Sequence, residues 1–231
     1  MSSRFTWKPL ALVVSASFVL TACNQSDAEQ VSAPVKPVQA VEQPAASQQA
    51  ITAQQVAEHY ADLAHATYSD ALATAQALRQ AVAALLTSPN DANLQTARDA
   101  WLKARMAYQQ SEVFRFGNAV VDDWEGQLNA WPLDEGMIDY VKEADYQYEL
   151  GNDGALANII ASESLQVGGE TIDVKSITPK LLADLNEIGG SEANVASGYH
   201  AIEFLLWGQD LNGFGAGAGE RPASDFAQGA E

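Results

Sequence analysis

The sequence has a single cysteine in 231 residues, so it forms no internal disulfide and no cysteine-based zinc cluster. It is also poor in basic residues, with 12 Lys and Arg against 30 Asp and Glu and a formal net charge of −18. This balance argues against nucleic acid as a partner, because phosphate binding needs a basic face, and it favours cations. With 18% charged residues the chain is not a coiled-coil rod, and with 47% hydrophobic residues it is not disordered throughout.

The N-terminal apolar run, Leu10 to Leu20, is too short to cross a bilayer as a stable helix and has the length of a signal-peptide core. Arg4 and Lys8 precede it, and it ends in Leu20-Thr21-Ala22-Cys23, which is typical of a bacterial lipobox. We therefore expect residues 1–22 to be a lipoprotein signal peptide and Cys23 to carry the lipid anchor. An ordinary secretory signal with a chance cysteine is the alternative.

The residue after the anchor, Asn24, favours an outer-membrane lipoprotein of the bacterial cell envelope that faces the periplasm, with surface exposure as an alternative. Residues 23–50 are expected to be the lipidated cysteine and a flexible linker. Gln, Ala, Ser, Pro and Val dominate there, and no helical or strand period is present.

Residues 51–231 are expected to form one all-α domain, a helical bundle. Two segments, about 52–88 and 92–116, carry apolar residues at helical spacing. Thr52 suits the first N-cap, and Ser88-Pro89-Asn90-Asp91 separates the two segments. The pattern predicts an antiparallel helix hairpin, the unit of a bundle.

The pattern is weaker beyond residue 117. Short helices are predicted over 120–131 and 134–142, and a short extended piece over 171–174. Thr178-Pro179 indicates a helix start, because proline suits the first helical position. A last helix over 192–207, with Ser191 as its N-cap, is followed by a glycine-rich stretch.

His200 and Glu203 are three residues apart on this last helix, so both side chains lie on one face. An imidazole and a carboxylate in that arrangement are able to share a metal ion. The alternative is a simple ion pair or a histidine satisfied in the core. The chain has no His-Glu-x-x-His motif, and the inverted form fails because residue 204 is Phe204.

Other carboxylates are candidates for the same site. Glu112 shares a helix face with Trp101 and Tyr108, where a charge is costly unless something pairs with it, and it is therefore a candidate ligand. Arg115, three residues on, then orients a ligand or binds an anion carried with the metal; a mutual Glu112–Arg115 pair is the alternative. Asp134, in a loop, is the weakest candidate ligand.

Several segments together resemble the signature of the imelysin family over roughly residues 51–231. They are Asn194-Val195-Ala196-Ser197-Gly198-Tyr199-His200-Ala201-Ile202-Glu203-Phe204-Leu205-Leu206-Trp207-Gly208-Gln209-Asp210-Leu211, Trp101 with Arg105, Tyr108 and Glu112, Phe114-Arg115-Phe116-Gly117, Asn129-Ala130-Trp131-Pro132-Leu133, and Gly219-Glu220-Arg221-Pro222-Ala223-Ser224-Asp225-Phe226. The resemblance implies an all-helical envelope protein built from two related bundles, often iron-regulated, with the Gly-x-His-x-x-Glu motif in a cleft between them. Family members are longer, so we expect only the first bundle here, in a fragment or a truncated product.

The resemblance implies that the protein binds a metal ion and takes part in iron uptake. Iron is the expected ion, and zinc and copper are alternatives. The ligands are then His200 and Glu203 with Glu112 and Asp134, Arg115 lies beside them, and a membrane iron-transport component is the implied partner. A metallopeptidase, the activity for which the family was first labelled, is the second function class. An envelope-tethered interaction module is the third.

Overall fold

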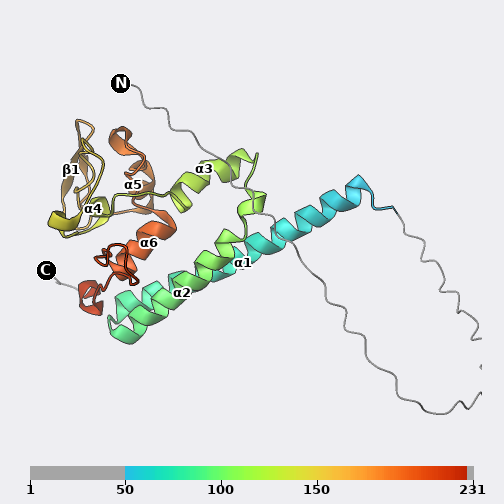
Figure 1. The fold of residues 1–231 in the computed structure, drawn as a ribbon, viewed down its shortest axis with the longest axis horizontal. Coiled ribbons are helices and arrows are strands. Elements are labelled where there is room, and N and C mark those ends of the chain that lie inside the picture. The colour runs from blue at the N-terminus through green and yellow to red at the C-terminus, as the bar shows by residue number, and fades with distance from the viewer. Residues whose placement is uncertain (1–49, 228–231) are drawn as a thin grey trace, which may run out of the picture. The chain divides into compact units, whose positions relative to one another are not determined.

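The computed structural model describes residues 50–227, and these are mostly helical (Figure 1). The α-helices are α1 (Ala53–Thr87), α2 (Asp91–Gln109), α3 (Ala119–Leu128), α4 (Glu135–Ile138), α5 (Pro179–Asp184) and α6 (Gly198–Trp207). Short 3₁₀ turns are η1 (Glu112–Phe114), η2 (Glu143–Asp145), η3 (Ile188–Gly190) and η4 (Ala223–Phe226). The signal peptide predicted for residues 1–22, the lipidated Cys23 and the linker up to residue 49 lie outside the described residues.

The predicted hairpin of α1 and α2 is confirmed. Thr52 and Gln55 form a capping box at the start of α1, each side chain accepting a hydrogen bond from the other's backbone N–H. Asn90 caps α2 by accepting from the backbone N–H of Asn93. The two helices pack along each other, and α1 continues beyond the end of α2 (Figure 1).

The second helix is shorter than the 92–116 predicted, because side chains take the backbone carbonyl of Tyr108. The hydroxyl of Ser111 donates to this carbonyl at 2.6 Å, and Arg115 Nη2 donates to it at 3.1 Å. The helix ends at Gln109, and the chain continues into η1.

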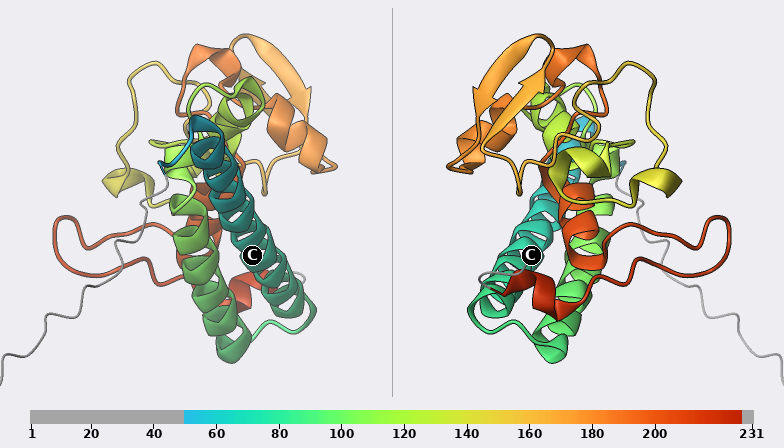
Figure 2. Two further views of the ribbon diagram at one scale, coloured as in Figure 1. Left: turned by 90° about the vertical axis from the view of Figure 1, so that its right-hand side faces the viewer. Right: turned by 90° about the vertical axis from the view of Figure 1, so that its left-hand side faces the viewer.

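Two buried clusters meet at α6. Leu78, Leu85, Leu94, Ala97, Trp101, Ala104 and Tyr108 of the hairpin form the first with Tyr199, Leu206 and Ala223. Residues after α3 form the second with Ala201 and Phe204: Met137, Ile138, Ile159, Leu165, Val167, Val174, Leu185 and Ala196. Figure 2 shows α6 lying against α2 on one side, with the hairpin of β1 (Ser164–Val167) and β2 (Glu170–Asp173) at the far end of the domain. Because α6 buries two of its faces, its third face is left to line a site.

The extended piece predicted over 171–174 is strand β2 (Glu170–Asp173), which pairs antiparallel with β1 (Ser164–Val167). The helix predicted over 134–142 is only the four residues of α4. The backbone carbonyls of Met137 and Ile138, the last two residues of α4, accept hydrogen bonds from the backbone N–H groups of Ile159 and Ile160. This pairing with a distant segment ends the helix.

The last helix begins at Gly198, six residues later than predicted. Ser191 is therefore not its N-cap, and Ser197 holds that position without a side-chain cap. The backbone carbonyl of Ala193 accepts a hydrogen bond from the N–H of Asp134, and that of Asn194 accepts one from the N–H of Glu187. Residues 193 and 194 therefore pair with other segments instead of forming a turn of helix. The helical propensity of residues 192–197 predicted a longer helix, because propensity contains no information about hydrogen bonds to distant segments.

Gly198 fixes where α6 begins. Its φ of +87° is in the left-handed region, and a Cβ there would lie 2.3 Å from the carbonyl oxygen of Gln127 in α3. The hydroxyl of Ser197 also donates to this carbonyl. Only glycine allows this close approach of α6 to α3.

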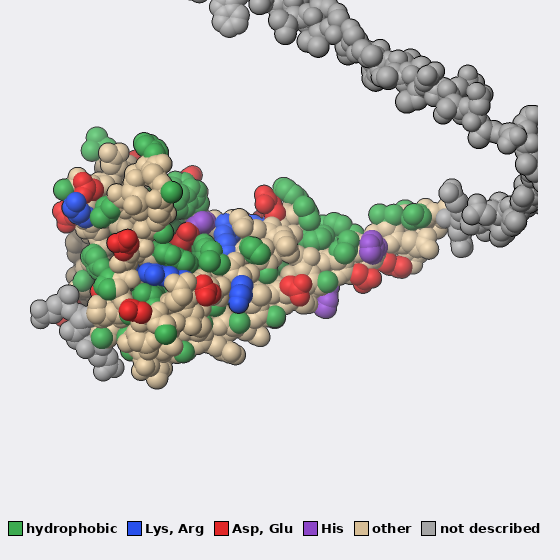
Figure 3. Space-filling view, turned by 60° about the horizontal axis from the view of Figure 1, so that its bottom comes forward, with side chains coloured by type: hydrophobic (Ala, Val, Ile, Leu, Met, Phe, Trp, Pro, Cys, Tyr) green, Lys and Arg blue, Asp and Glu red, His purple; other side chains and the backbone are tan. Residues whose placement is uncertain are grey.

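Much of the N-terminal half of α1 is exposed, although the Tyr60 ring packs edge-on against Phe114, with 5.2 Å between ring centroids. Val56, Tyr60 and Leu63 are at helical spacing but stay exposed, and Figure 3 shows apolar side chains gathered on this projecting end. Within residues 50–227 no helix combines the length and apolar character that crossing a membrane requires.

Candidate metal site

The third face of α6 carries His200, Glu203 and Trp207, which line a cavity of about 540 Å³. Their spacing of three and four residues puts them in one stripe of the helix. The remaining walls come from Trp101 and Leu102 of α2, from the chain after α6, and from Trp131, Leu133 and Glu135. The cavity therefore joins segments far apart in the sequence around one histidine.

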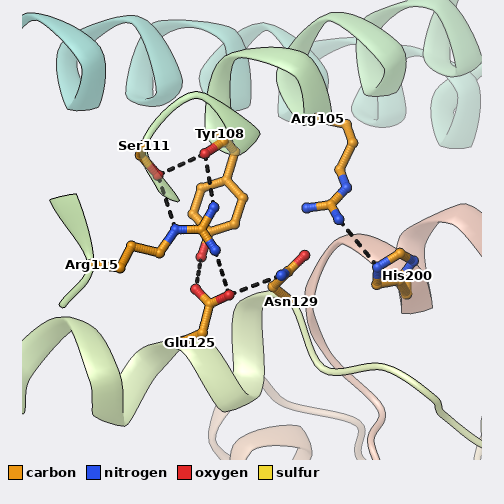
Figure 4. A network of polar contacts seen from close by, with 7 residues as sticks. All are labelled: Arg105, Tyr108, Ser111, Arg115, Glu125, Asn129 and His200. Carbon is orange, nitrogen blue, oxygen red and sulfur yellow. Dashed lines mark hydrogen bonds and ion pairs between the residues drawn. The ribbon is translucent and has the colours of Figure 1, made fainter. Parts of the chain in front are cut away.

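His200 is held at both ring nitrogens. Its Nδ1 lies 3.0 Å from Glu203 Oε2, and its Nε2 lies 3.4 Å from Nη2 of Arg105 (Figure 4). A guanidinium has no acceptor, so Nε2 accepts from Arg105, and the ring carries its hydrogen on Nδ1 and donates it to Glu203. The ring also packs on Trp131, with 4.9 Å between centroids. Sequence reasoning thus placed His200 and Glu203 together correctly.

Glu135 at the start of α4 is a further carboxylate on this cavity. Burial raises the pKa of its carboxyl to about 7, with smaller contributions from the negative charges of Glu203 and Asp210 and an opposing one from Arg221. Glu135, Glu203 and Asp210 therefore place like charges on the cavity that His200 lines. A cation bound there would relieve their repulsion.

Arg115 does not orient a predicted metal ligand. Its guanidinium binds the Glu125 carboxylate, the Ser111 hydroxyl and the Tyr108 carbonyl, while its plane lies over the Tyr108 ring (Figure 4). Glu125 also accepts from Tyr108 and Asn129. We call Tyr108, Ser111, Arg115, Glu125 and Asn129 the Glu125 network. Burial alone would raise the pKa of the Glu125 carboxyl, but the hydrogen bonds and the charge of Arg115 hold it below its ordinary value.

Glu112 and Asp134 do not line the cavity beside His200. Glu112 begins η1 and is exposed, and among the described residues its pairing with Arg115 is not observed. Asp134 is buried and accepts hydrogen bonds from Tyr146 and Asn152, next to a second cavity of about 820 Å³. Within residues 50–227 no group of three or more His, Cys, Asp or Glu side chains is gathered closely enough to hold a metal. The ligand roles of Glu112 and Asp134 stay predictions.

Arg105 and Glu135 belong to the site but were not singled out from the sequence as site residues. Arg105 had a usable signal, because it shares the helix face of Trp101 and Tyr108 at spacings of four and three. Glu135 had none that separates it from Asp134, its neighbour. Only the structure shows that Glu135, and not Asp134, lines the cavity together with His200. We call Arg105, Glu135, His200 and Glu203 the His200 cluster.

Comparison with known proteins supports the resemblance seen in the sequence. A family model described as imelysin matches residues 64–231. Iron-regulated protein A of Synechococcus elongatus is 38% identical over 68 residues, which cover 29% of this chain and 19% of that relative. The family match extends over most of the described residues and includes the whole of the His200 cluster. The chain belongs to the imelysin family.

Proposed function

We propose that this protein captures a metal ion, iron in the first place, at the cavity beside α6. The ion takes the place of the hydrogen shared by His200 and Glu203, and Glu135, which lines the same cavity, is a candidate third ligand. The observation that carries the proposal is the separation of 3.0 Å between His200 Nδ1 and Glu203 Oε2 on the cavity wall. Two donors about 2.1 Å from one ion and at right angles to each other have about this separation.

The charge of the site supports a cation. Glu203, Glu135 and Asp210 all face the same cavity, and their mutual repulsion is part of what keeps the pKa of Glu135 high. Imidazole with carboxylate oxygens suits iron, and also zinc or copper. Iron is favoured among these because the relative from Synechococcus elongatus is called an iron-regulated protein.

We further propose that the protein is a lipoprotein of the cell envelope, anchored through Cys23, and that it serves iron uptake with a membrane transport component. The lipobox Leu20-Thr21-Ala22-Cys23 supports the anchor. Mass spectrometry of the protein from its host membranes tests it. We expect an acylated Cys23 at the mature N-terminus and loss of membrane association in Cys23→Ser; an unmodified cysteine contradicts the anchor.

The metal proposal is tested by calorimetric titration of the full chain with ferrous, ferric, zinc and copper ions. We expect saturable binding near one ion per chain, with iron among the ions bound, and its loss in His200→Ala. Glu112→Gln is the matched control, because Glu112 is exposed and does not line the cavity. Absence of binding by a folded wild-type chain, or full binding by His200→Ala, contradicts the proposal.

A further inference from the structure

Arg105 is a cation in an unusual position, beside the nitrogen of a candidate metal ligand. Its Nη2 donates to Nε2 of His200, and its guanidinium lies 5.7 Å from the Tyr199 ring centroid. No carboxylate pairs with it among the described residues. Its Nη1 is buried and has no hydrogen-bond partner there. The guanidinium thus has unused donor capacity beside His200.

Ion binding at Nδ1 of His200, as proposed above, increases this unused capacity. A neutral imidazole carries one N–H, so an ion on Nδ1 leaves the hydrogen on Nε2. Nε2 then becomes a donor that faces the donors of Arg105. A metal-binding histidine almost always gives its second N–H to a carboxylate, a carbonyl or water. Here the side chain facing that position is an arginine, which has no acceptor.

We propose that Arg105 and Nε2–H of ion-loaded His200 together bind a small oxyanion of the carboxylate or bicarbonate type, and that the oxyanion and the metal ion strengthen each other's binding. This inference rests on the proposed function. A planar oxyanion accepts two hydrogen bonds from the fork of a guanidinium and has lone pairs left for the imidazole. It also offsets the positive charge of Arg105, which otherwise opposes the ion.

A second orphan polar group lies nearby and has a simpler explanation. Asn129 Oδ1 is buried without a partner, and Figure 4 shows it turned to the side of the Glu125 network on which Arg105 lies. A water molecule between Asn129 and Nη1 of Arg105 would satisfy both groups in the ion-free protein. That water leaves the donor–donor conflict at Nε2 unresolved once the ion binds. The two explanations therefore differ in whether metal affinity depends on the anion.

The test is a calorimetric titration of the full chain with zinc and, without oxygen, ferrous iron, in sodium acetate, sodium bicarbonate and sodium chloride at equal ionic strength. We expect the metal Kd to be about tenfold lower in either oxyanion than in chloride. In Arg105→Gln this ratio should fall below about twofold, because the glutamine oxygen itself accepts from Nε2–H. Circular dichroism checks that the variant is folded.

The outcomes separate the two proposals. Ion binding of equal strength in all three salts overturns the oxyanion site and leaves the metal site standing. Absence of ion binding in every salt overturns both. Nitrogen-15 NMR of the histidine rings gives a second measurement that does not need the variant. It should show the His200 hydrogen on Nδ1 without the ion and on Nε2 with it; a hydrogen that stays on Nδ1 overturns the inference.

Discussion

The Glu125 network and the His200 cluster lie on the same side of α2, and they use their charges in opposite ways. In the Glu125 network Arg115 gives all three of its guanidinium nitrogens to acceptors, and Glu125 accepts from three side chains. In the His200 cluster Arg105 keeps a buried nitrogen unpaired, and burial raises the pKa of the Glu135 carboxyl to about 7. Charges that are paired, as those of Arg115 and Glu125 are, stabilise the fold, whereas an unpaired buried donor and a perturbed carboxyl mark a candidate ligand site.

The largest expected effect comes from disrupting the close contact between the start of α6 and α3. This contact positions the helix that carries His200 and Glu203. Gly198→Ala places a Cβ against the Gln127 carbonyl at a positive φ. We expect a loss of at least about 3 kcal/mol in the free energy of unfolding, from backbone strain and overlap together. Urea denaturation measures it. Gly126→Ala is the control, because it has free space within α3 and should gain about 0.5 kcal/mol. Equal stability of the two variants contradicts the close approach.

The next largest effect separates the two clusters. Arg115→Met leaves the partly buried Glu125 without its cation, and we expect about 2 kcal/mol of stability to be lost. Ion binding should stay within about twofold of wild type, because Arg115 is not part of the His200 cluster. Lys180→Met, which removes an exposed pair with Asp184, should cost less than about 0.5 kcal/mol. A strong loss of ion affinity in Arg115→Met would show that the Glu125 network also contributes to ion binding, which contradicts the separation of the two clusters.

A smaller effect follows from the pKa of Glu135, which is about 7 in the folded protein against an ordinary value of 4.5. The folded state holds this proton more tightly than the unfolded one, so stability falls as the pH rises from about 5 to 8. Discounted for solvent screening, the wild type should lose about 1 kcal/mol relative to Glu135→Gln over this range. Denaturation midpoints against pH measure the difference. Glu143→Gln, at an exposed site, should leave the wild-type pH profile in place, and the same profile in Glu135→Gln contradicts the assignment.

The smallest effect is expected at Glu112, the ligand candidate that the sequence favoured next after the His-x-x-Glu pair. Glu112→Gln should leave stability within about 0.5 kcal/mol, because the side chain is exposed. Ion affinity should change less than about twofold. Calorimetry alongside His200→Ala tests this. A tenfold loss would instead bring Glu112 into the His200 cluster.

Local signals in the sequence predicted α1 and α2 well, because capping residues and apolar spacing act over a few neighbours. Thr52, Asn90 and the polar turn between them are such signals, and the all-helical class is confirmed. The predicted start of the last helix at residue 192 was wrong, because the backbone carbonyls of residues 193 and 194 accept hydrogen bonds from other segments of the chain. The shortened α2 has the same kind of cause, since Ser111 and Arg115 capture one carbonyl.

By itself the sequence determined that His200 and Glu203 share a helix face, because three residues bring side chains to the same side of any α-helix. It also determined the family, through a long motif. Only the tertiary structure decided which charges meet that face. Arg105 reaches His200 and Arg115 turns to Glu125 because α3 and α6 approach α2 at different heights, held by the contact of Gly198 with Gln127. Partners of a charged side chain depend on distance in space, which a linear pattern does not contain.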